Sequence, residues 1–109
     1  MDKTYDKAIR FLEEFRKLDS EMPLQMAVAF MLIVNYEGLT MKELCERLGI
    51  SQSSTSRNVA ALSKYHRLNR PGLDLVRATE DPMERRRKLV HLTSKGRRVA
   101  ESLKALLEA

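Results

Sequence analysis

A cluster of hydroxyl, amide and cationic side chains is the part of this sequence best suited to recognition chemistry. Its members are Ser51, Gln52, Ser53, Ser54, Ser56, Arg57 and Lys64. At about 100° per residue, a helix over this segment has an apolar side formed by Thr55, Val59 and Leu62. The opposite side then presents Ser53, Arg57 and Lys64. Because hydroxyls and cations bind base edges and phosphates, this helix is typical of one that reads DNA.

A second group of cations lies in the run ERRRK. It comprises Arg85, Arg86, Arg87 and Lys88, with Arg77 on the preceding predicted strand. The net charge is −2 over residues 1–50 and +7 over residues 51–109. A basic run on a strand is by default a solvated face, but here it follows the polar helix within the basic half. The pattern favours contact with a nucleic acid.

Length and composition indicate a single-domain protein without an internal disulfide or a membrane-spanning segment. A chain of 109 residues forms one domain, residues 1–109, and its single cysteine excludes an internal disulfide. The longest apolar run, residues 24–34, is shorter than the roughly 18 residues that span a bilayer. Residues 1–10 are charged throughout and do not resemble a signal peptide. We therefore expect no membrane association and a bacterial-type cytoplasmic location, with the protein on the nucleoid when bound to DNA.

Catalytic and metal sites are not predicted. His66 and His91 are 25 positions apart with no second cysteine, which argues against a zinc site. Cys45 falls on the apolar stripe of its predicted helix, where we expect a small buried hydrophobe and not a redox sensor. The sequence has no glycine-rich phosphate loop and no nucleophile paired with a histidine, so we expect no enzyme activity and no cofactor.

The periodicity predicts a mainly α-helical chain with a small β-hairpin. Helices are expected over residues 4–18, 23–36, 40–48, 51–65 and 94–109, and strands over residues 73–78 and 85–92 with a turn near Asp81 and Pro82. Thr40 and Glu43 have capping-box spacing, and Gly49 can end the third helix. Residues 40–65 then form a helix-turn-helix and residues 73–92 a basic wing. The order α-α-α-α-β-β-α predicts a winged helix-turn-helix.

The two terminal helices, residues 4–18 and 94–109, have apolar arcs wide enough to contact a partner subunit. The residues expected at a dimer interface are Tyr5, Ile9, Leu12, Phe15, Val99, Leu103, Leu106 and Leu107. For the first helix, deep burial in a single core explains the same pattern.

Two segments resemble the MarR (multiple antibiotic resistance regulator) family of bacterial transcription regulators. LTMKELCERLGISQSSTSRNVAAL is similar to the family's helix-turn-helix, and DPMERRRKLVHLTSKGRRV to its wing and following helix. The resemblance implies a homodimer on a palindromic operator, usually as a repressor, with wings in the minor groove and the terminal helices at the dimer interface. It places Ser51, Gln52, Ser54, Ser56 and Arg57 at recognition-helix positions, and Asp81, Arg85 and Arg86 at wing positions.

Three departures from the family pattern change these expectations. Residues 64–72 form a link between recognition helix and wing that is several residues longer than in the family, so the family does not establish the placement of the wing. Met83 stands at the wing tip, where the family usually has an arginine for the minor groove. The long C-terminal helices of the family are missing, which predicts a reduced dimerisation region and makes a small-molecule inducer site doubtful.

Two alternatives stay open at this point. The first is a winged-helix module that binds another protein, as an adaptor or anti-repressor, through its first and last helices. The second is a protein that binds RNA or binds duplex DNA nonspecifically. The charge asymmetry favours nucleic acid over protein as the main partner, but it does not distinguish specific from nonspecific binding.

Overall fold

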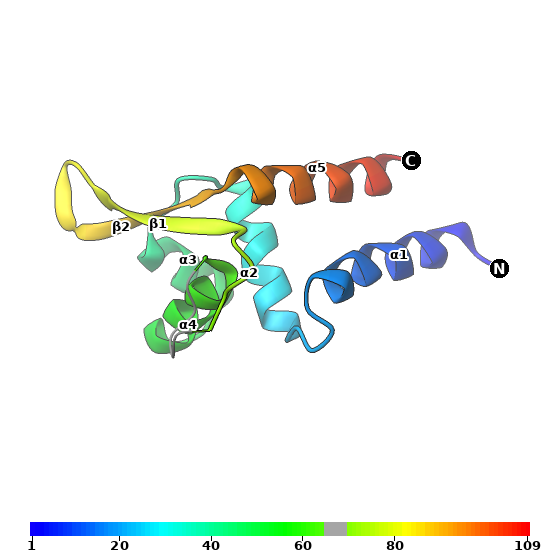
Figure 1. Ribbon diagram of the computed structural model, residues 1–109, viewed down its shortest axis with the longest axis horizontal. Coiled ribbons are helices and arrows are strands. Elements are labelled where there is room, and N and C mark those ends of the chain that lie inside the picture. The colour runs from blue at the N-terminus through cyan, green and yellow to red at the C-terminus, as the bar shows by residue number, and fades with distance from the viewer. Residues whose placement is uncertain (65–69) are drawn as a thin grey trace.

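The computed structural model describes residues 1–64 and 70–109 (Figure 1). The chain forms five helices and one antiparallel hairpin, in the predicted order. The elements are α1 (Lys3–Leu18), α2 (Leu24–Asn35), α3 (Met41–Leu48), α4 (Gln52–Leu62), β1 (Val76–Asp81), β2 (Glu84–Leu92) and α5 (Ser94–Glu108). The predicted mainly helical winged fold is therefore confirmed. Within the described residues, no helix has both the length and the apolar character needed to cross a bilayer.

Side-chain caps begin four of the helices, the first being α1, where Asp2 accepts the Thr4 N–H at 2.8 Å. Thr40 and Glu43 form the predicted reciprocal capping box at α3, and Gly49 ends α3 with a φ of 67°. Ser51 accepts the Ser54 N–H at 3.1 Å to begin α4. Thr93 accepts the Gly96 N–H at 3.0 Å to begin α5. Each cap satisfies an N–H group that the first helical turn leaves without a partner.

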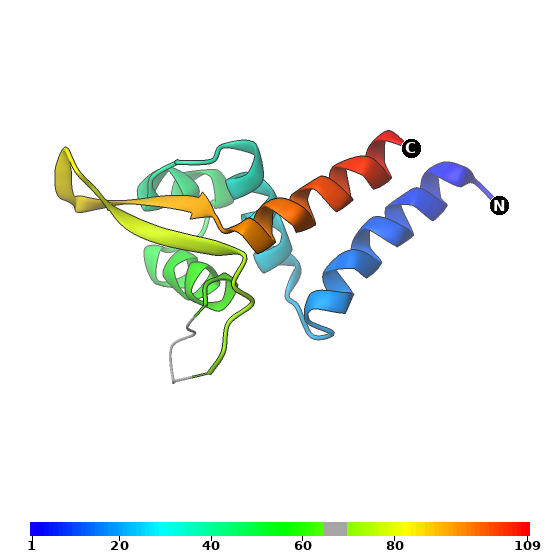
Figure 2. The same cartoon turned by 45° about the horizontal axis from the view of Figure 1, so that its top comes forward.

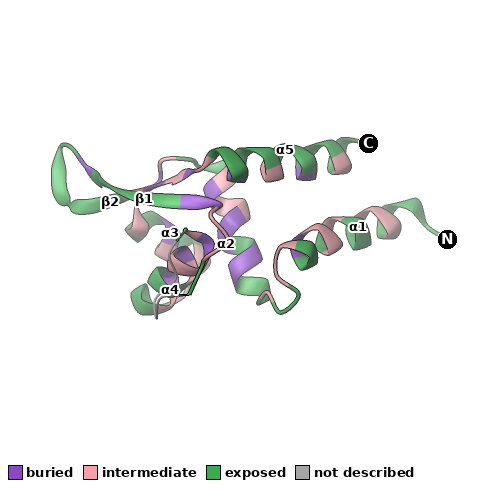
Figure 3. Cartoon of the chain, in the orientation of Figure 1, coloured by how far each residue is buried: buried purple, intermediate pink, exposed green. Residues whose placement is uncertain are grey.

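One apolar core joins the helix-turn-helix to the base of the hairpin (Figure 3). Its fully buried side chains come from six different elements and from the segment before β1; the largest are Phe30, Ile33, Leu44, Leu62, Leu75, Leu103, Val76 and Val90. The helix α2 supplies the centre of this core, with Met26, Ala29, Phe30 and Ile33 buried. However, Leu24 and Val28 on the same helix are exposed, so α2 is not buried on all sides.

The hairpin is tied to the helices through its longer strand. The Gly38 N–H donates to the Val90 carbonyl and the Val90 N–H donates to the Leu39 carbonyl, both at 2.9 Å. A bridge between Thr40 and Leu89 continues this pairing. The base of the wing is thus held by the segment that leads into α3, while the tip projects beyond the core (Figure 1).

The segment before β1 corrects two predicted boundaries. The N–H groups of residues 72–75 donate to the carbonyls of Lys64, Ala61, Ser63 and Leu62, respectively, at 2.8–3.2 Å. Residues 73–75 therefore cap the end of α4 instead of pairing with β2, so β1 begins at Val76 and not at residue 73. The helix ends at Leu62 and not near residue 65. The expected loop over residues 66–72, with His66, lies partly outside the described residues.

The terminal helices α1 and α5 extend away from the wing, and both termini lie at that end (Figures 1 and 2). The molecule measures 51 × 28 × 27 Å. The Lys7 ammonium donates to the Leu107 carbonyl at 3.2 Å and so links the two helices. Phe15 and Leu103 are only 5% and 1% exposed, so these two predicted interface residues belong to the chain's own core.

Candidate nucleic-acid interface

The rotation of α4 is determined by its buried side. Thr55, Val59 and Leu62 are at most 4% exposed, as predicted from the helical pattern. The Thr55 hydroxyl satisfies its buried oxygen by donating to the Ser51 carbonyl at 2.9 Å. On the flank of the helix, the Asn58 amide donates to Gln25 of α2 at 3.0 Å. These contacts leave Ser53, Arg57 and Lys64 exposed on the outer side.

The hydroxyls at the start of α4 differ in their availability. Ser51 caps the helix and its hydroxyl also lies 3.0 Å from the Ser54 hydroxyl. Ser54 in turn accepts a hydrogen bond of 3.1 Å from the Arg57 guanidinium, which orients that side chain along the helix. Ser51 and Ser54 thus hold the start of α4 and orient Arg57, whereas the side chains of Gln52 and Ser56 are exposed.

The register of the hairpin separates the basic run into two faces. Glu80 lies opposite Lys88, and Ala78 lies opposite the buried Val90, so these residues share the face that packs on the core. Because side chains alternate along a strand, Arg86 shares that face with Lys88. Both side chains line a groove with Lys42 of α3 and Gln52 of α4. Arg85 belongs to the other face, whereas Arg87, beside the register shift at Asp81, lies at the outer rim of the groove with Glu43 and Glu84.

We call this space the wing groove. It has a volume of about 270 Å³ and is lined by Met41, Lys42, Gln52, Thr55, Ser56, Arg86 and Lys88. A second hollow, of about 490 Å³, continues from it between α4 and β1 towards Ser63 and Lys64. The two hollows share Met41, Ser56 and Lys88, so a trough separates the recognition helix from the wing.

Glu43 and Glu84 lie at the outer rim of the wing groove, with Arg86 and Arg87. Hydrogen bonds from the Thr40 N–H and hydroxyl lower the pKa of Glu43, so this carboxylate is ionised and committed to its cap. Glu84 is paired with Arg87 at 2.7 Å. Both acids are therefore held by local partners.

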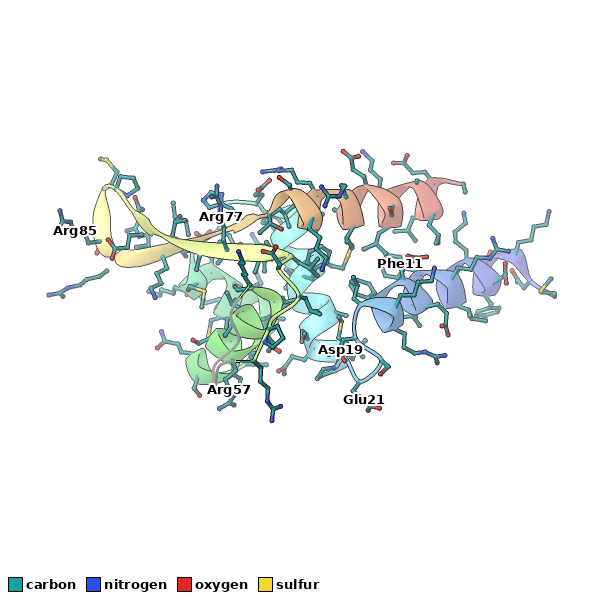
Figure 4. All side chains as sticks on the ribbon, viewed as in Figure 1. Phe11, Asp19, Glu21, Arg57, Arg77 and Arg85 are labelled. Carbon is teal, nitrogen blue, oxygen red and sulfur yellow. The ribbon has the colours of Figure 1, made fainter. Side chains whose placement is uncertain are left out.

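Arg87 has a structural role that the sequence did not suggest. Its guanidinium lies 2.7 Å from Glu84 and 3.5 Å from Asp81, across the turn of the hairpin. Asp81 is 8% exposed and accepts the Met83 N–H at 2.9 Å. These contacts order the tip, where Met83 is 92% exposed, and they leave Arg85 projecting from the end of the wing (Figure 4).

Arg77 lies on β1 and borders the second hollow, with Ser56, Lys64 and Lys88. It alternates with the buried Val76 and lies opposite His91, so its side chain leaves the face of the hairpin that is turned away from the core. Figure 4 shows Arg77 above the hairpin and Arg57 below α4. The structure thus brings Arg86 and Lys88 together in the wing groove, with Arg77 at the hollow that continues from it, while Arg57 lines neither space.

The remaining candidate sites are minor. Cys45 is half-buried and its thiol donates to the Ile50 carbonyl at 3.0 Å, close to the predicted buried role. Over residues 1–64 and 70–109, no three potential metal ligands cluster together. An apolar groove of about 410 Å³ lies between α1 and α2 and is lined by side chains that include Phe11, Leu12, Leu24 and Val28.

Residues 22–64 match the model of the MarR family. No sequence of a curated protein gives a significant match. The solved structures of similar fold include the S. aureus MepR–DNA complex, with a TM-score of 0.71 and 18% identity over 97% of this chain and 77% of that one. BpsR of Bordetella bronchiseptica, whose DNA binding is regulated by 6-hydroxynicotinic acid, has a TM-score of 0.63 and 20% identity. The match covers 96% of this chain and 71% of the BpsR chain.

RV1404 of Mycobacterium tuberculosis has a TM-score of 0.68 and 22% identity, covering 86% of this chain. This chain spans 58% of the length of RV1404. The family match ends at Lys64, and the similarity in fold continues through the wing and α5. The resemblance to the MarR family is thereby confirmed: the helix-turn-helix matches that family, and the whole chain has the fold of MarR-family DNA-binding transcription regulators.

Proposed function

We propose that this protein is a sequence-specific, double-stranded DNA-binding transcription regulator without enzyme activity. The observation that carries the proposal is the exposed face of α4, which presents Gln52, Ser56 and Arg57 beside the cationic wing groove. A helix fits the major groove, where amide and guanidinium groups can form paired hydrogen bonds with base edges. The wing then lies along the adjacent backbone or minor groove.

The proposed roles of the residues are contact with bases, contact with phosphates and ordering of the wing tip. Gln52, Ser53, Ser56 and Arg57 read base edges, with Ser51 and Ser54 holding the start of the helix in place. Arg85, Arg86 and Lys88 contact phosphates, and Lys64 does so at the far end of α4. Arg87 orders the wing tip through Asp81 and Glu84. If about four cations meet phosphates, the logarithm of affinity falls with the logarithm of salt with a slope of about −3.6.

The protein is proposed to act as a homodimer. The side chains of Tyr5, Ile9 and Leu12 are 73%, 58% and 55% exposed and lie at spacings of four and three residues on α1. They form an apolar stripe on the part of the molecule that points away from the wing (Figures 1 and 2). Leu107 on α5 is 47% exposed, and Val99 and Leu106 are partly exposed. A two-fold dimer through these helices binds a palindrome.

Binding to such an operator blocks access to a promoter, so repression is the proposed effect on transcription, in the cytoplasm and on the nucleoid. The MepR–DNA complex and the regulation of BpsR support DNA binding as the output of this fold. A small-molecule inducer is not part of the proposal.

Selection of bound duplexes from a random pool is the experiment that tests this function. The expected result is a palindrome whose half-sites are about one helical turn apart, or a multiple of that distance. Enrichment of a single asymmetric site would contradict the homodimer, and no enrichment over random DNA would contradict specificity.

A second candidate is a module that binds another protein through α1 and α5, favoured by the apolar stripe on α1. It predicts that duplex DNA is bound weakly and that Arg57→Ala changes nothing in partner binding.

A further inference from the structure

The trough between α4 and the hairpin lies where a DNA backbone strand would pass if these two elements occupied neighbouring grooves of a duplex. In a B-form duplex, one sugar-phosphate strand separates the major groove from the neighbouring minor groove. If α4 occupies the first groove and the wing the second, that strand passes through the space between the two elements. This step rests on the proposed function. The space exists in the protein as the wing groove and its continuation towards Lys64.

The wing groove has the chemistry of an anion site. Lys42, Arg86 and Lys88 line it from two different elements, and no acidic residue is among its lining side chains. Within the described residues, these three cations form no ion pair or hydrogen bond. The amide of Gln52 and the hydroxyl of Ser56 add neutral donors. Glu43 and Glu84 at the rim and Glu80 opposite Lys88 form no ion pair with these three cations, so their donors remain available to an entering anion.

We infer that the wing groove binds one phosphodiester group of the backbone strand that separates the two DNA grooves, and that Lys42 of α3 is a phosphate ligand. Lys42 lies outside both the recognition helix and the wing, so neither motif indicates it. Its position in α3 is set by the Thr40–Glu43 capping box, and it faces β2 across the groove. The phosphate is thus held between α3 and β2, with α4 beneath it.

The experiment compares Lys42→Ala with Lys104→Ala on a duplex selected by the wild-type protein. Lys104 is an exposed lysine of α5, so this control removes the same charge far from the groove. Lys42→Ala is expected to reduce the salt slope by about 0.9 and to raise the Kd for selected and random duplexes by the same factor. Lys104→Ala is expected to leave the slope unchanged. A thermal melt of each variant confirms that it is folded.

A neutral methylphosphonate, placed in turn at each phosphate of the operator, locates the contact. At one position per half-site, the methylphosphonate should weaken wild-type binding but cause no further loss with Lys42→Ala, because both changes remove the same contact. Additive losses at every position would overturn the inference, as would equal slopes for Lys42→Ala and Lys104→Ala.

Two other outcomes distinguish the inference from the proposed function. If the wild-type protein binds duplex with a steep salt slope that Lys42→Ala does not change, the proposed function stands and the phosphate site is wrong. If the wild-type protein binds no duplex, both are wrong. Saturable binding of inorganic phosphate at micromolar concentration, lost in Lys42→Ala, would identify a free-anion site and overturn the assignment to the DNA backbone.

Discussion

The guanidinium of Arg97 grips the carboxylate of Glu37 with two hydrogen bonds, of 2.8 and 2.6 Å. The same carboxylate accepts the Leu92 N–H at 3.0 Å. One side chain after α2 therefore holds both the end of β2 and the first turn of α5. Through this contact the wing and the terminal helix are attached to the segment that leads into the helix-turn-helix.

The stability of the fold should depend on the ionisation of Glu37. Burial by itself raises its pKa, but the hydrogen bonds from Leu92 and Arg97 and the Arg97 charge outweigh burial and lower the pKa below its usual range. A carboxyl whose pKa is lower in the folded state contributes stability above its unfolded pKa and loses it as pH falls through the folded pKa. The contribution of Glu37 is therefore present at neutral pH and lost in the acid range below about pH 4.

Glu37→Gln should lower the free energy of unfolding at pH 7 by about 1 kcal/mol, a modest value because the pair is partly exposed to solvent. For a domain of this size, that loss lowers the Tm by about 4–8 °C. Thermal melts at pH 7 and pH 3 measure the effect, and the difference between variant and wild type should shrink at pH 3. Glu101→Gln, an exposed site on α5, is the matched control. A pH-independent difference would contradict this account.

Gly72 and Gly49 should respond differently to alanine. A Cβ at Gly72 would lie 1.7 Å from the Ser63 carbonyl oxygen, within the backbone that caps α4. At Gly49 a Cβ meets no atom within 4 Å, and only the φ of 67° is unfavourable. Gly49→Ala should therefore lower the free energy of unfolding by about 1 kcal/mol, and Gly72→Ala should lower it by more than about 3 kcal/mol. Chemical denaturation measures the free energy of unfolding of both variants. Equal losses would show that the backbone of residues 72–75 shifts readily to accommodate a Cβ.

The α1 stripe predicts a variant that dissociates the dimer without unfolding the protomer. Ile9 is 58% exposed, so Ile9→Asp should leave the Tm of the protomer nearly unchanged while burying a charge in the proposed interface. Sedimentation should shift from twice the protomer mass to 12.6 kDa. Thr79→Asp adds the same charge on the exposed wing and should remain dimeric. A wild-type protein that sediments only at 12.6 kDa would remove the basis of this prediction.

Arg57 should distinguish base reading from phosphate binding. Arg57→Ala is expected to weaken binding to the selected duplex by about 1–3 kcal/mol, or about 5- to 150-fold, and to affect random duplex much less. Competition binding at one fixed salt concentration measures both affinities. Arg98→Ala, an exposed arginine of α5, serves as the control. Equal losses on the two duplexes would make Arg57 a phosphate ligand.

Arg86 and Arg87 are neighbours with different expected roles. Arg86→Ala removes a free cation of the wing groove and should reduce the salt slope by about 0.9. Arg87 is paired with Asp81 and Glu84, so Arg87→Ala should loosen the wing tip while changing the slope less. Salt titrations give the slopes, and amide exchange at Met83 reports the order of the tip. Reversed effects would show that the ion pairs open when DNA binds.

Local sequence signals were sufficient for the fold and for the rotation of α4. The capping box at Thr40, the glycine after α3 and the spacing of Thr55, Val59 and Leu62 act over one or two helical turns, and such short-range physics is readable in the chain. The same spacing indicated which side of α4 carries Arg57. The family resemblance rested on these segments.

Tertiary structure decided what local patterns could not. Residues 73–75 have a strand-like sequence. However, their N–H groups donate to carbonyls at the end of α4 that have no partner within the helix. The packing of the hairpin places Arg86 in the wing groove and Arg77 at the hollow beyond it, and Asp81 at the turn pairs with Arg87. Lys42 joins the wing groove only because α3 packs beside β2. The capping of α4 by residues 72–75 and the place of Lys42 depend on contacts between different elements, where burial and pairing override local preference.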